Sequence, residues 1–112
     1  ANVWEVRDGE VVEHLIDARE AFGMSSATLD DLRGGDAAFN AQVVRETLAG
    51  QQGPIRDAVV IGAAAAIVAD GTLVPPGEFI DRMRSGIRLA QESIDSGGAS
   101  AALTRWIAAS NR

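Results

Sequence analysis

The chain has 112 residues, enough for one small domain, and 46% of them are hydrophobic, with alanine supplying much of that fraction. It carries a formal charge of −6 without any run of Lys or Arg, which disfavours nucleic-acid binding, and it has no cysteine for disulfides, thiolate metal sites or nucleophiles. Its longest apolar stretch, residues 58–69, is shorter than the roughly 20 residues that cross a bilayer. We therefore expect a cytoplasmic protein without nucleic-acid or membrane partners.

The N-terminal part predicts a β-hairpin. Two strand-like runs, residues 2–7 and 10–16, flank Asp8-Gly9, which favours a two-residue turn because both turn residues need positive φ. The second run has apolar residues on both faces, so we expect cover on both sides. Trp4 is interpreted as a packing anchor. The chain begins in this strand pattern without an initiator Met, which we interpret as a start inside a larger protein.

Residues 17–31 predict an irregular connection, because Gly23, Ser25 and Ser26 interrupt any regular pattern. A helix is predicted next, over residues 36–48. Its apolar residues recur at helical spacing, so we expect one buried stripe. That stripe comprises Ala37, Ala41, Val44 and Leu48.

Three more helices complete the prediction of one hairpin and four helices with no domain boundary. The helix over 54–69 begins with proline, which suits a first turn, and its nearly continuous apolar surface predicts an enclosed central position. Residues 78–96 predict an amphipathic helix, and residues 100–110 a short last helix with Trp106 turned inward. The apolar stripe of the amphipathic helix comprises Phe79, Met83, Ile87, Ala90 and Ile94.

Gly34-Gly35-Asp36 is the most informative short motif. Its two glycines can take backbone angles that are closed to other residues, and a helix begins directly after them. The free N–H groups of such a helix start could bind an anion. However, Asp36 places a negative charge where the anion would lie. We therefore favour a tight turn in which Asp36 caps the following helix.

Other polar candidates also receive a structural interpretation. Asp30 and Asp31 could suggest a Mg²⁺ pair but are typical of a solvated loop. His14, the single histidine, is interpreted as a half-buried packing residue. Arg84 and Arg88 lie one turn apart and could hold a phosphate, but neighbouring acids offer ordinary surface pairs. The residues alone assign no catalytic, cofactor-binding or metal-binding side chain.

The order of these motifs resembles the C-terminal part of anthranilate phosphoribosyltransferase, an enzyme of tryptophan biosynthesis. Two positions depart from the family pattern: Phe39 stands where an acidic residue usually precedes Asn40, and Gly62 stands where Asn is usual. The likeness covers nearly the whole chain, through residues 3–11, 22–23, 29–40, 53–66, 90–97 and 103.

The resemblance implies an α/β family fold of which residues 1–112 form the C-terminal segment. Enzymes of this family transfer a phosphoribosyl group from phosphoribosyl pyrophosphate to anthranilate, use Mg²⁺ and are commonly homodimers. Their diphosphate loop, anthranilate-contacting residues and Asp-Glu metal pair lie upstream of the part resembled here. We therefore expect a segment that is inactive alone, binds no Mg²⁺, contributes no site residues and partners the rest of its own chain, or itself when isolated.

Two alternatives remain open from the sequence. One is a segment of a related glycosyltransferase of the nucleoside phosphorylase type. The other is a free-standing, non-enzymatic interaction module on the same scaffold.

Overall fold

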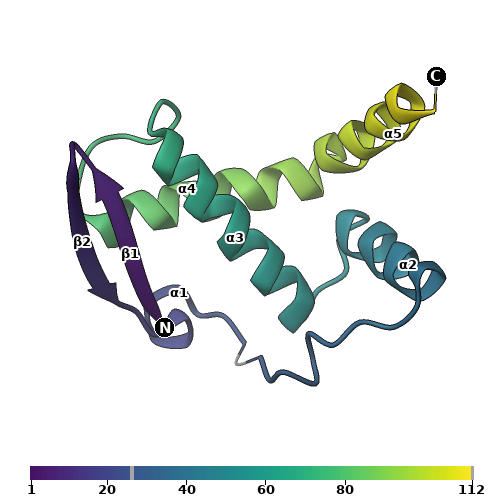
Figure 1. The fold of residues 1–112 in the computed structure, drawn as a ribbon, viewed down its shortest axis with the longest axis horizontal. Coiled ribbons are helices and arrows are strands. Elements are labelled where there is room, and N and C mark those ends of the chain that lie inside the picture. The colour runs from purple at the N-terminus through teal and green to yellow at the C-terminus, as the bar shows by residue number, and fades with distance from the viewer. Residues whose placement is uncertain (26, 112) are drawn as a thin grey trace.

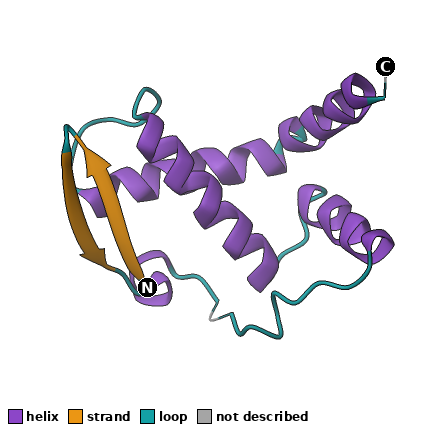
Figure 2. Cartoon of the chain, in the orientation of Figure 1, coloured by secondary structure: helices purple, strands orange, loops and turns teal. Residues whose placement is uncertain are grey.

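A computed structural model describes residues 1–25 and 27–111, so Ser26, one of the predicted breakers, lies outside the described residues. This part of the chain contains a two-stranded hairpin and five helices. The hairpin lies at one end, α3 and α4 cross in the middle, and α2 and α5 extend toward the other end (Figures 1 and 2). The elements are β1 (Asn2–Arg7), β2 (Glu10–Leu15), α1 (Ala18–Phe22), α2 (Ala37–Leu48), α3 (Pro54–Asp70), α4 (Phe79–Asp95) and α5 (Gly98–Ser110).

The hairpin forms as predicted. Asp8 and Gly9 have φ of 52° and 78°, the positive values that a tight two-residue turn requires, and Val6 pairs with Val11 beside it. The expectation that the second strand is covered on both sides is wrong, since Val11 and Leu15 are exposed. The sheet has only two strands here, and the helices cover one of its faces.

The core lies where α3 crosses α4. The predicted α4 stripe is confirmed, because all five of its residues are buried. They pack with Val60, Ala64 and Val68 of α3 in one cluster. The crossing is close at Gly86 of α4: a Cβ there would lie 2.9 Å from the carbonyl oxygen of Ala64. Small residues at the crossing therefore allow the two backbones to approach.

Three packing expectations are wrong. α3 is not enclosed, since one stripe faces α4 while Val59 on another face is 44% exposed. On α2, Thr47 is buried, whereas Val44 of the predicted stripe is exposed. Trp106 on α5 is 72% exposed and Trp4 is also exposed, so neither anchors the core. Helical spacing places apolar residues on one face, but a second layer must cover that face to bury them.

The connection predicted to be irregular contains the short helix α1. Asp17 caps its start, accepting hydrogen bonds from the backbone N–H groups of Arg19 and Glu20. Gly23 ends it in the left-handed conformation, with φ of 66°. Asp17 and Gly23 were therefore cap signals, but five residues are too few to show a helical period. In the described part of the chain, no helix combines the length and apolar character that crossing a bilayer requires.

Candidate functional site

The predicted tight turn at Gly34-Gly35 is wrong, since the turn lies at residues 29–32 and the two glycines follow it in an irregular segment. This Gly-Gly segment is held by Asn40, which the sequence did not single out as functional. The Asn40 side chain accepts a hydrogen bond from the Gly35 N–H at 2.9 Å and donates one to the Gly35 carbonyl at 3.0 Å. Asp36 caps α2 as predicted, its carboxylate accepting from the Phe39 N–H at 2.8 Å. The capping carboxylate occupies the helix start, where an anion would otherwise bind.

The predicted reason for the two glycines is wrong. Neither Gly34 nor Gly35 is among the glycines with positive φ. The side chains of α2 instead lie against them: a Cβ on Gly34 would lie 2.6 Å from Asn40 Oδ1, and one on Gly35 would lie 3.0 Å from Phe39 Cδ1. A larger residue at either position would therefore displace the Asn40 or Phe39 side chain.

The loop acids are engaged by neighbouring groups. Asp31 accepts from the Thr28 backbone N–H at 2.9 Å, and Asp30 pairs with Arg33 at 3.1 Å. Within residues 1–25 and 27–111, no three His, Cys, Asp or Glu side chains are grouped so that they could hold a metal ion. Asp30 and Asp31 therefore each have a local partner in the loop, as the interpretation of a loop pair expected.

The most buried charged cluster joins β1 to α4. Arg82 donates two hydrogen bonds to the Glu5 carboxylate, at 2.5 and 3.1 Å, and a third to the Gly77 carbonyl at 3.0 Å. The Arg82 and Glu5 side chains are only 9% and 12% exposed. Hydrogen bonding to Arg82 lowers the pKa of Glu5, and the same contact raises the pKa of Arg82. The pair is therefore fully ionised at neutral pH.

His14 belongs to the same cluster. Its Nε2 lies 3.2 Å from Glu5 Oε1, and its ring stacks on Phe79 with centroids 3.9 Å apart and planes within 7°. The side chain is 23% exposed, which confirms the interpretation as a half-buried packing residue. His14 shares the Glu5 carboxylate with Arg82 and stacks its ring on Phe79, so it links β2 to the start of α4.

A second arginine joins the other ends of the core helices. Arg56 of α3 forms two hydrogen bonds of 3.0 Å with Asp95 at the end of α4. The arrangement is asymmetric: the Arg56 side chain is 5% exposed and that of Asp95 57%. Arg84, a predicted phosphate candidate, instead pairs with Asp81 at 3.3 Å, as the alternative interpretation expected, and Arg88 is exposed nearby.

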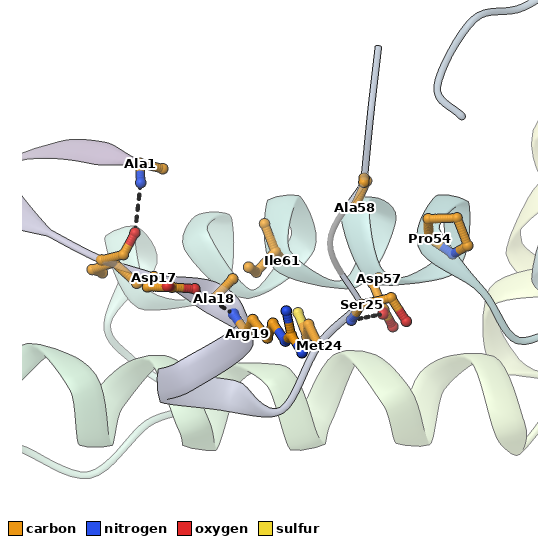
Figure 3. Close-up of a pocket in the computed structure, with 12 residues that line it drawn as sticks. Ala1, Asp17, Ala18, Arg19, Met24, Ser25, Pro54, Asp57, Ala58 and Ile61 are labelled. Carbon is orange, nitrogen blue, oxygen red and sulfur yellow. Dashed lines mark hydrogen bonds between the residues drawn. The ribbon is translucent and has the colours of Figure 1, made fainter. Parts of the chain in front are cut away.

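A hollow of about 410 Å³ lies where the chain start, α1 and α3 meet. Figure 3 shows the residues that line it. Its polar groups bind backbone. The Asp57 carboxylate accepts from the Ser25 N–H at 2.9 Å, Asp17 caps α1, and the amino group of Ala1 donates to the Ile16 carbonyl at 2.6 Å. The Ser25–Asp57 contact holds the connection after α1 against α3, and the other two contacts fix the start of α1 and the open end of the hairpin, so all three have structural roles.

A second hollow, of about 370 Å³, is an apolar groove between β1 and α3. Trp4 and Val6 line one side, and Ile61 and Ala65 line the other. Glu5 is the charged side chain at its border, and it is already paired with Arg82. The groove offers apolar contact area rather than reacting groups.

Comparisons with known proteins cover almost the whole chain. A family model described as "Glycosyl transferase family, a/b domain" matches residues 1–100. The anthranilate phosphoribosyltransferase of Arthrobacter sp. is 49% identical over 96% of this chain, and that of Salinispora arenicola is 50% identical over 94%. The matched parts are 30% and 29% of those relatives, and the Streptomyces avermitilis enzyme, 47% identical, is likewise covered over 30%. The chain thus spans about 30% of the length of the curated relatives it matches.

Proposed function

The chain belongs to the glycosyl transferase family with an a/b domain, and from this premise we propose that it is the C-terminal segment of an anthranilate phosphoribosyltransferase. One observation carries the proposal. Along nearly the entire chain, close to half of all positions are identical in enzymes of that name. The complete enzyme would transfer a phosphoribosyl group from phosphoribosyl pyrophosphate to anthranilate in the cytoplasm, in tryptophan biosynthesis.

The segment serves this reaction as a packing unit. Its buried charged groups, Glu5, Arg56 and Arg82, are engaged in ion pairs that join helices and hairpin. Mg²⁺ and both substrates would bind to other parts of the enzyme, since the loop acids of this segment hold neighbouring backbone and side chains. Transfer of the phosphoribosyl group breaks the bond between the sugar and diphosphate, and the charge that develops on the departing diphosphate needs positioned donors and a metal, so the 112-residue chain alone should be inactive.

The exposed apolar surface supports a segment over a free-standing module. Trp4, Leu15, Val59 and Trp106 are exposed, on both strands of the hairpin and on α3 and α5. Apolar side chains beside an open strand edge invite association. We therefore expect the isolated chain to self-associate, with the −6 charge opposing this modestly, and light scattering over a concentration series would show its mass rise. A strict monomer at all concentrations would favour the module instead.

A chimera tests the function directly. Residues 1–112 replace the aligned part of the Arthrobacter relative, and the purified chimera is assayed for consumption of anthranilate in the presence of phosphoribosyl pyrophosphate and Mg²⁺. We expect turnover, because the segment supplies the packing surface that the rest of the enzyme needs. The isolated segment, assayed in parallel, should match a reaction without protein.

The matched control is a second chimera that carries the aligned segment of the Salinispora relative at the same junctions. If that control is active and the chimera with residues 1–112 is folded but inactive, the proposed function is wrong. Turnover by the isolated 112-residue chain would contradict the supporting role.

A further inference from the structure

The two faces of the hairpin differ in polarity. Alternation and strand pairing place four apolar side chains on the outward face, while the other face carries Glu5 and His14, which contact α4, together with Val3 and Val12. The outward residues are Trp4, Val6, Val11 and Leu15, which are 59%, 75%, 63% and 81% exposed. Within residues 1–112 alone, burial of apolar area would favour the opposite orientation, with these residues against the helices, whereas in the proposed enzyme the outward face is available to the rest of the chain.

A specific polar contact opposes that preference. Arg82 of α4 binds the Glu5 carboxylate through both terminal nitrogens and the Gly77 carbonyl through Nε. His14 from β2 and Glu78 just before α4 are the other ionisable groups that act on this pair. Because the Arg82 side chain is 9% exposed, it has little access to water that could replace its carboxylate partner.

We infer that the Glu5–Arg82 pair is an orientation latch, which holds the hairpin with its more polar face, that of Glu5 and His14, on α4 and its more apolar face outward. In the reversed orientation Trp4 and Val6 would face Arg82, and the guanidinium would be buried without a carboxylate. A buried ion pair adds little net stability compared with apolar packing, but one unpaired member is costly, so the pair selects between orientations. The inference concerns the chain's own packing and does not depend on the proposed enzymatic role.

Trp4 reports the orientation directly. Trp106→Phe leaves Trp4 as the single tryptophan, and the exposure of Trp106 on α5 makes that change mild. In this background Arg82→Met removes the charge while keeping a long apolar stem, so Glu5 is left unpaired and is driven toward water. We expect the emission of Trp4 to shift to the blue and its quenching by acrylamide to fall several-fold, at protein concentrations where the parent is monomeric.

Arg84→Met is the matched control, since Arg84 lies on the same helix but is exposed and pairs with Asp81. It should leave Trp4 emission and quenching unchanged. If Arg82→Met keeps its helical circular dichroism and Trp4 stays as exposed as in the parent, the latch is refuted.

If Arg82→Met loses its helical circular dichroism, a variant with the two charges exchanged provides a second test. The double variant Glu5→Arg/Arg82→Glu restores an opposite-charge pair with the residues interchanged. A folded double variant with the Trp4 quenching of the parent supports the latch. A double variant that is unfolded, or whose Trp4 is protected from acrylamide, overturns it.

Discussion

The helix crossing predicts that one substitution, Gly→Ala, has opposite effects at two positions. Within a helix, Ala is favoured over Gly by about 0.8–1.0 kcal/mol. At Gly62 on α3 nothing lies within 4 Å of an added Cβ, so Gly62→Ala should stabilise by up to this amount. At Gly86 the new Cβ would lie 2.9 Å from the Ala64 carbonyl oxygen and 3.3 Å from Ala64 Cα, both backbone atoms that cannot rotate away.

The magnitude follows from these two terms. Overpacking a tight site costs about 1–3 kcal/mol, so Gly86→Ala should be destabilising by up to about 2 kcal/mol despite the better helix former. Both variants gain the same helix propensity. The difference between their free energies of unfolding therefore measures only the cost of separating α3 from α4. In a domain near this size, each kcal/mol corresponds to about 4–8 °C in melting temperature.

Thermal and urea unfolding, followed by circular dichroism at a protein concentration below any association, measure both variants against the parent. The parent and Gly62→Ala serve as references for the packing term. Equal stability of the Gly86→Ala and Gly62→Ala variants would refute the reasoning, because it would show that the crossing has room for a methyl group.

Three further predictions concern polar contacts. Asn40→Ala should cost about 1 kcal/mol and speed hydrogen exchange at the Gly35 amide, because both side-chain bonds to Gly35 are lost; unchanged exchange would contradict this. Asp95→Ala should destabilise more than Arg56→Met in urea unfolding, since it leaves a buried guanidinium unpaired whereas Asp95 can be hydrated. Because the pKa of Glu5 lies below its usual 4.5, its stabilising contribution is complete above about pH 4.5 and is lost as pH falls through the folded-state pKa; the melting temperature should drop over that acid range, with a smaller drop in Glu5→Gln.

Local and periodic signals in the sequence determined the secondary structure. Asp8-Gly9 specified the turn through its positive φ, and Asp36 and Pro54 marked helix starts through groups adjacent in the chain. The α4 stripe was readable because its apolar residues follow one helical period and its opposite face is polar. The short helix α1 escaped prediction because its cap residues enclose less than two turns.

The family resemblance was also readable from the sequence, because motif order and spacing are linear properties, and the comparisons confirm it. The interpretation of Asp36 as a helix cap rested on its residue type at a helix start, and the structure confirms the cap. The turn predicted at Gly34 and Gly35 lies instead at residues 29–32, and the two glycines have side chains of α2 packed against them, which no local signal in the sequence specifies.

Only the tertiary structure decided which predicted faces are covered and which distant charges meet. Helical spacing placed Trp106 among apolar neighbours, but burial requires a second layer, and α5 has none over that side chain in the described part of the chain. Glu5 and Arg82 are 77 residues apart, and nothing local to either residue specifies the other. Their pairing depends on how the hairpin lies against α4. A residue's own neighbours therefore determined its element, whereas its burial and its partners depended on how the elements pack in three dimensions.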